Sequence, residues 1–120
     1  MRLKDIIEKL HLKPRVGVGD PDAEVGNGYV SDLLSDVLAN CEESDLWITL
    51  QIHPNIVGVA SMKGLAAIVI INGREPQEDT VKRAEENGVP ILVSDMTAFE
   101  LSGRLYNLGL RGRRRDSEGV

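Results

Sequence analysis

The feature that most constrains the fold is a run of seven residues, 65–71, that contains no polar side chain. A membrane helix needs about 20 apolar residues, so this run is far too short to span a bilayer. A run of this length instead predicts a strand that is apolar on both faces. Such a strand must be covered on both sides, as happens at the centre of a parallel sheet.

The rest of the chain alternates between strand-like and helix-like segments. Apolar runs predict further strands at residues 46–52 and 89–93, and short strands are expected near residues 15–18 and 24–30. Apolar residues at helical spacing, with boundary signals from Ser, Pro and Gly, predict helices over residues 3–12, 32–40, 55–63, 78–87 and 97–108. From residue 46 onward strand and helix alternate, which favours right-handed crossovers and parallel strands. We therefore predict an α/β fold, a single three-layer α/β sandwich with a mainly parallel sheet.

One domain over residues 1–109 accounts for all of these elements. Residues 111–120 carry four arginines and one apolar side chain, Val120, so we expect residues 110–120 to form a disordered Arg-rich tail. The chain has a net charge of −5 and residues 111–120 contribute +2, which leaves −7 on the remainder. An acidic body argues against nucleic-acid binding.

Composition and the N-terminal segment predict the compartment. Cys41 is the single cysteine and cannot form an internal disulfide, which favours a reducing environment. The N-terminal segment has no apolar stretch typical of a signal peptide, and no run is long enough to cross a membrane. We expect a cytoplasmic protein without membrane contact.

Catalytic signatures are missing from the sequence. No Gly-Lys-Ser/Thr phosphate loop and no Gly-x-Ser-x-Gly nucleophile turn occurs, and no His, Cys and carboxylate cluster has metal-ligand spacing. The sequence therefore predicts no enzyme, no metal and no cofactor.

A ligand site is expected at the carboxyl ends of the parallel strands, where open α/β sheets bind ligands. Four loops, here together called the rim, are predicted there, at residues 26–32, 51–55, 72–75 and 94–97. Their amides, hydroxyls, imidazole and guanidinium, together with helix N-termini, suit a small anionic ligand such as a nucleotide or a phosphorylated metabolite. The candidate ligand-binding residues are Asn27, Gly28, Ser31, Asp32, His53, Asn55, Asn72, Gly73, Arg74, Ser94, Asp95 and Thr97.

Structural roles compete with ligand binding at several of these positions. Ser31, Asp95 and Thr97 are placed to cap helices. Arg74 could pair with Glu75 or with another carboxylate of the rim instead of binding an anion. His53 fits either a hydrogen-bonded structural histidine or an acid/base group.

Residues 22–37, with the sequence Asp-Ala-Glu-Val-Gly-Asn-Gly-Tyr-Val-Ser-Asp-Leu-Leu-Ser-Asp-Val, resemble the signature of the DRTGG-domain family. Residues 47–57 and 71–76 strengthen the resemblance, which covers most of the chain. Asp22 and Gly28 of the name-giving motif are present, while Ala23, residues 25–26 and Asn27 depart from it. The family is similar to the N-terminal domain of HPr kinase/phosphorylase. The resemblance implies an α/β sandwich that serves as a regulatory or assembly module, often dimeric, with no catalysis of its own.

These observations lead to one principal hypothesis and two alternatives. The principal hypothesis is a non-catalytic regulatory or assembly module that forms a homodimer, binds a small anionic ligand at the rim, and could also meet a protein partner. One alternative is a small enzyme that uses His53 with Asp32 or Asp95. The other is an adaptor that docks an acidic partner through the arginines of residues 111–115.

Overall fold

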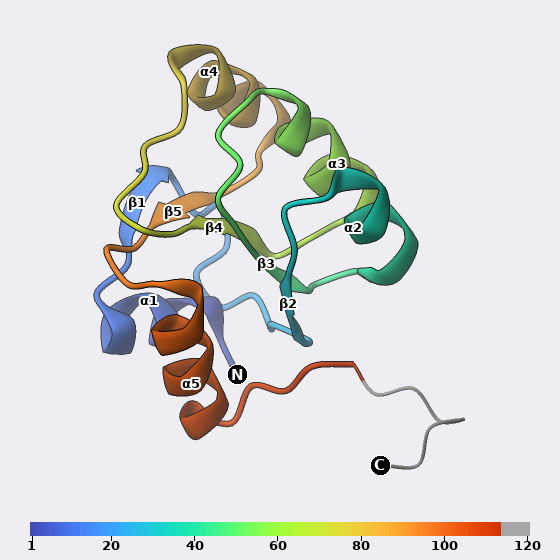
Figure 1. The fold of residues 1–120 in the computed structure, drawn as a ribbon. Coiled ribbons are helices and arrows are strands. Elements are labelled where there is room, and N and C mark those ends of the chain that lie inside the picture. Colours follow the sequence, from blue (N-terminus) through green and yellow to red (C-terminus); the bar gives the residue numbers. More distant parts are fainter. Residues whose placement is uncertain (114–120) are drawn as a thin grey trace.

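The computed structural model describes residues 1–113, in which a five-stranded sheet lies between two layers of helices (Figure 1). The strands are β1 (Lys13–Val16), β2 (Gly28–Val30), β3 (Leu46–Thr49), β4 (Ala67–Ile70) and β5 (Ile91–Val93). The helices are α1 (Leu3–Leu10), α2 (Leu34–Asn40), α3 (Asn55–Lys63), α4 (Glu78–Asn87) and α5 (Ala98–Leu108).

The strands are ordered β1-β5-β4-β3-β2, and β2 to β5 run parallel. The apolar run at residues 65–71 becomes β4, the middle strand, and all four residues of β4 are 0% exposed. The predicted α/β fold with a mainly parallel sheet is therefore confirmed. β1 pairs antiparallel with β5 and occupies an edge, where Pro14 is tolerated because its missing N–H is not needed by a second neighbour.

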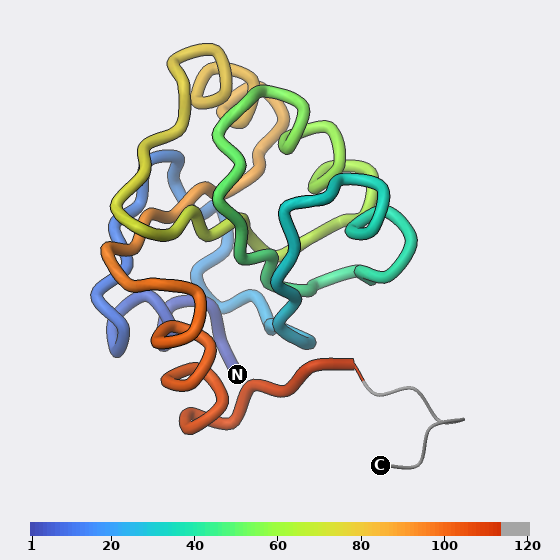
Figure 2. Tube along the Cα trace, in the orientation of Figure 1, coloured from blue at the N-terminus to red at the C-terminus, as the bar shows by residue number. Residues whose placement is uncertain are grey.

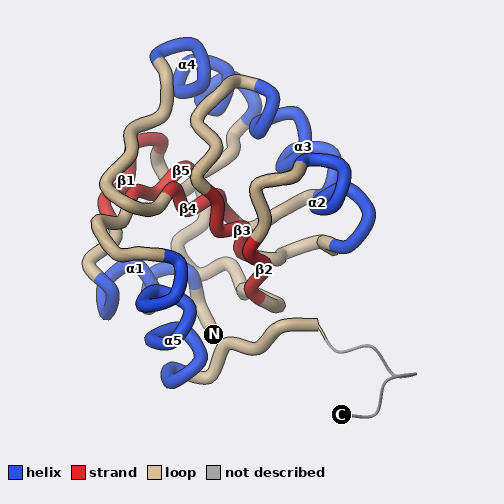
Figure 3. Tube along the Cα trace, in the orientation of Figure 1, coloured by secondary structure: helices blue, strands red, loops and turns tan. Residues whose placement is uncertain are grey.

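Alternating side chains of the strands form two apolar cores, one on each face of the sheet. Ala67 and Val69 pack in the cluster that holds buried residues of α1 and α5. Ile68 and Ile70 pack in the cluster that holds buried residues of α2, α3 and α4. Figure 3 shows the strands as the middle layer between these two sets of helices, which confirms the predicted three layers.

The structure moves or shortens several predicted elements. The strand predicted at residues 24–30 is reduced to β2, because Val25 and Gly26 donate their N–H groups to Met1 and Ser44 instead of to a strand. The helix predicted from residue 32 begins at Leu34, because Ser31 Oγ accepts from the N–H of Leu33 in a local turn and Asp32 Oδ1 accepts from the N–H of Leu50. The opening helix ends at Leu10, with His11 in the left-handed region at φ 52°, before Pro14 is reached.

The C-terminal residues also differ from the expected disordered tail. Leu110 is buried, and the carbonyl of Arg111 accepts a hydrogen bond from the N–H of Gly28 at 2.9 Å. Residues 110–113, here called the C-terminal strap, thus lie against the domain, and Figure 2 shows their path past β2. Residues 114–120 of the expected tail lie outside the described residues.

None of the helices within residues 1–113 combines the length and the apolar character needed to cross a bilayer.

The doubly covered sheet predicts a large effect of substitution at its centre. Ile68→Ala should lower the free energy of unfolding by about 2–5 kcal/mol, because it removes a fully buried side chain and leaves a cavity. Urea denaturation followed by circular dichroism measures this change. Met62→Ala on α3 is the control, since Met62 is 77% exposed and its loss should change stability by less than about 0.5 kcal/mol. Equal effects of the two substitutions would contradict the central position of β4.

Candidate functional site

The loops after β4 and β5 meet at the carboxyl edge of the sheet, as predicted. The N–H groups of Asn72 and Gly73 donate to the carbonyls of Met96 and Ser94, both at 2.9 Å. Asn72 and Gly73 both adopt left-handed backbone conformations, at φ 59° and 65°. A Cβ at Gly73 would lie 3.3 Å from a carboxylate oxygen of Asp95, so the turn both favours glycine and brings Asp95 close.

The loop after β3 connects the two sides of this rim. Asp32 Oδ1 accepts hydrogen bonds from Thr49 Oγ1 at 2.9 Å and from the N–H of Leu50 at 2.7 Å. On the other side, Arg74 Nη1 donates to the carbonyl of Leu50 at 2.7 Å. The rim is therefore closed by contacts among its own loops. Thr49 and Leu50, which organise it, were not among the predicted residues because a buried threonine and a backbone amide carry no motif.

The predicted helix caps have different outcomes. Thr97 is the N-cap of α5 and its Oγ1 accepts from the N–H of Glu100, as predicted. Ser31 is not a helix cap, since its Oγ accepts from the N–H of Leu33 in a local turn before α2 begins. Asp95 is not the N-cap of α5 either, since it precedes the capping residue Thr97 by two positions. Its carboxylate lies 3.5 Å from Lys13 Nζ.

Glu75 pairs with Arg15 and not with Arg74. Arg15 Nε and Nη2 donate to the two carboxylate oxygens of Glu75 at 2.6 and 2.9 Å. These hydrogen bonds hold the pKa of Glu75 below its usual value. The pair ties β1 to the loop after β4, and it leaves Arg74 anchored on the carbonyl of Leu50 alone among the described residues.

His53 and Asn55 are exposed at the start of α3. Within residues 1–113 His53 forms no hydrogen bond or ion pair with Asp32 or Asp95. Oδ1 of Asp32 already accepts from Thr49 and Leu50, and Asp95 contacts Lys13. The acid/base pairing required by the enzyme alternative is therefore not formed in this structure.

Asn27 and Gly28 lie at the opposite edge from the predicted rim. Gly28 is the first residue of β2, so both residues are at the amino end of a parallel strand and not at its carboxyl end. The sequence analysis placed them on the rim because it assigned residues 26–32 to a loop beyond the carboxyl end of a strand. Residues 31–33, which follow β2, form the loop that reaches the carboxyl edge.

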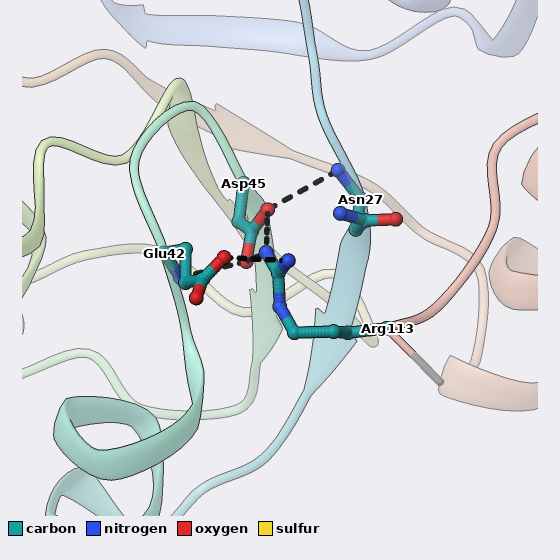
Figure 4. Close-up of polar contacts among 4 residues, drawn as sticks. All are labelled: Asn27, Glu42, Asp45 and Arg113. Atoms are coloured by element: carbon teal, nitrogen blue, oxygen red, sulfur yellow. Dashed lines mark hydrogen bonds and ion pairs between the residues drawn. The ribbon is translucent and has the colours of Figure 1, made fainter. Parts of the chain in front are cut away.

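At that amino edge, a buried carboxylate holds the C-terminal strap (Figure 4). Asp45 is 2% exposed and accepts hydrogen bonds from the N–H groups of Glu42 at 2.9 Å and Asn27 at 3.2 Å. Arg113 Nη2 lies 3.0 Å from Asp45, and Arg113 Nη1 lies 2.6 Å from Glu42. The hydrogen bond to Asp45 raises the pKa of Arg113. Sequence reasoning missed this cluster because 68 residues separate its charges.

An apolar groove of about 130 Å³ lies between α5, β2 and the C-terminal strap. Its lining is mostly apolar and includes Arg111, whose guanidinium stacks 3.8 Å above the ring of Tyr106. The lining includes Val30, Ile48, Leu105, Tyr106, Leu110 and Arg111. A second cavity, of about 250 Å³, lies at the amino edge beside residues 18–20 and 23–24. Neither cavity is lined by a residue of the carboxyl-edge rim.

Cys41 lies in the core that faces α2 to α4. Burial, with a further contribution from the charge of Asp45, raises the pKa of its thiol to about 11. The thiol is therefore protonated near neutral pH and is a poor nucleophile there. Within residues 1–113, no three His, Cys, Asp or Glu side chains are grouped so that they could hold a metal ion.

Comparison with known proteins supports the fold. No family model matches the chain, and no curated protein matches it in sequence. Among solved structures, it is similar to the CBS and DRTGG domains of the regulatory region of a Clostridium perfringens pyrophosphatase, complexed with the activator diadenosine tetraphosphate. The TM-score is 0.71 with 14% identity, and the match covers 85% of this chain and 44% of that chain. The fold is DRTGG-like. At this identity the likeness concerns the fold and not the bound ligand.

The Asp45 cluster predicts that the C-terminal strap contributes to stability. Arg113→Ala should lower the free energy of unfolding by about 1–3 kcal/mol, because a buried carboxylate loses a charged hydrogen-bond donor while it keeps two backbone donors. Arg104→Ala is the control, since Arg104 forms an exposed pair with Glu100 and should contribute less than about 0.5 kcal/mol. Urea denaturation of both variants measures the difference. If both variants unfold like the unsubstituted chain, the strap does not stabilise the domain.

Proposed function

We propose that this chain is a non-catalytic regulatory module that associates with a second copy of itself and binds a small anionic ligand. The observation that carries the self-association is a set of exposed apolar side chains on and beside α5 and β2. Val30, Leu33, Phe99 and Tyr106 are exposed and belong to β2, the residues just after it, and α5. α5 and β2 are in contact, and Val30 and Tyr106 of this set line the apolar groove between them.

An exposed apolar surface of this kind favours association. Large apolar patches on a soluble domain commonly mark interaction sites. Phe99 is 89% exposed, which is unusual for a phenylalanine in a domain that contains no other. The likeness in fold to part of a pyrophosphatase regulatory region supports a regulatory role for the association.

The proposed ligand site is the carboxyl-edge rim. Arg74 is exposed there with its guanidinium oriented by the hydrogen bond to Leu50, and the exposed His53 and Asn55 precede and begin α3. A guanidinium beside a helix N-terminus suits phosphate groups. The similar pyrophosphatase region was solved with diadenosine tetraphosphate, which supports a nucleotide as the first ligand to test.

Self-association predicts a mass above that of the monomer. Light scattering during size-exclusion chromatography of the full chain should give a dimer at micromolar concentration. The dimer should persist at high salt, because screening weakens ion pairs and leaves apolar contacts intact. A monomeric mass throughout a concentration series would contradict the proposal.

Ligand binding predicts a rise in the unfolding temperature. Diadenosine tetraphosphate, ATP and inorganic phosphate are added separately to the full chain, and a ligand at 100 times its dissociation constant should stabilise the fold by about 2.7 kcal/mol. Arg74→Gln should remove this rise, whereas Arg83→Gln on the exposed side of α4 should preserve it. The rim is not the ligand site if the two variants lose the rise equally, or if none of the three compounds produces one.

A further inference from the structure

We propose that two copies join about a two-fold axis through one surface, the α5–β2 face, formed by Val30, Phe99, Gly103 and Tyr106. This inference rests on the self-association proposed above and assigns its interface and its partner, a second copy of the chain. In the proposed contact, Phe99 of each copy packs against the helix at Gly103 of the other.

Phe99 is the projecting part of this face. It lies in the first turn of α5, and its ring is almost fully exposed. Leu101 and Leu105 point into the core, which places Phe99, Gly103 and Tyr106 together on a different flank of the helix. That flank borders the groove, since Ser102 and Tyr106 line it. A ring in this position gains burial only when a second surface covers it.

Gly103 is the receiving part of the same face. A Cβ at Gly103 would meet no atom within 4 Å, so nothing within the described chain requires a glycine there. Glycine inside a helix lowers its stability relative to alanine. Gly58 of α3 is equally open, so an open glycine by itself does not define a contact. Gly103 differs because it lies four positions from the exposed ring of Phe99, and the ring of a second copy can pack against the helix backbone there. The projecting ring of Phe99 and the open position at Gly103 thus lie on one flank of α5. A two-fold interface needs such a self-complementary surface.

Opposite charges at the two ends of the α5–β2 face are also consistent with association of two copies. Arg111 lies beside Tyr106 at one end, and Asp32 follows β2 at the other. Asp32 lies four positions after Gly28, which contacts the strap, and four steps of extended chain span about 13 Å. Within residues 1–113 neither Arg111 nor Asp32 forms an ion pair. An antiparallel two-fold arrangement brings Arg111 of each copy towards Asp32 of the other.

The C-terminal strap directs association to the helix and away from the strand edge. β2 is an edge strand, and such an edge can pair with the edge of another chain. Its Gly28 N–H is already taken by the carbonyl of Arg111, and Arg113 holds the strap on Asp45. Within residues 1–113, the strap therefore covers part of the β2 edge and leaves the flank of α5 that carries Phe99 exposed.

Sedimentation velocity over a concentration series tests the interface with two substitutions. Phe99→Ser should weaken the dimer about tenfold or more, since it removes a central aromatic contact. Gly103→Gln should weaken it to a similar degree, because a longer side chain fills the recess. The same substitution should raise the unfolding temperature of the monomer, since glutamine favours helix over glycine. This opposite effect on stability separates a blocked interface from a damaged fold.

Matched controls lie on α3, in the opposite helix layer. Met62→Ser removes an exposed apolar side chain, and Gly58→Gln fills another helix position where a Cβ meets no atom within 4 Å. Both controls should leave the dimer unchanged. A dimer that neither Phe99→Ser nor Gly103→Gln weakens, or that the α3 controls weaken equally, would overturn the α5–β2 face while self-association stands. A monomeric unsubstituted chain would overturn both.

Discussion

Burial of β4 on both faces is the constraint on which the rest of the molecule depends. A strand with Ile68 and Ile70 on one side and Ala67 and Val69 on the other is stable only between two apolar layers. The helices that connect β3 to β4 and β4 to β5 supply one of these layers. α1 and α5 supply the other, which joins the beginning and the end of the described chain in one core.

In a sheet of parallel strands joined by helices, the loops that follow the strands all lie at one edge. In this protein hydrogen bonds between those loops hold most of them in place. Asp32 accepts from the loop after β3, Arg74 donates to it, and the turn at Asn72 bonds to the loop after β5. Most of the predicted polar residues therefore have structural partners. The side chain of Arg74 remains exposed at this edge.

The two edge strands of the sheet, β1 and β2, are protected from pairing with another chain in different ways. β1 carries Pro14, which reduces the capacity of that edge to pair with another strand. β2 is covered in part by the C-terminal strap, and the strap is held by the buried carboxylate of Asp45. The same strap forms one wall of the apolar groove beside α5. Protection of a strand edge and the shape of the groove thus depend on one short segment.

The sequence by itself determined the fold class, the parallel order from residue 46 onward, and the bounds of α3 and α4, because apolar periodicity and Pro or Gly boundary signals are local. Thr97 as a helix cap was predicted for the same reason. Only the tertiary structure decided that Asn27 and Gly28 lie at the amino edge, that Glu75 pairs with Arg15, and that Arg113 reaches Asp45. These contacts join residues 60 or more positions apart, or depend on where a short strand begins. The register of a strand and the partner of a charge are set by packing across the sheet, and no local pattern encodes them.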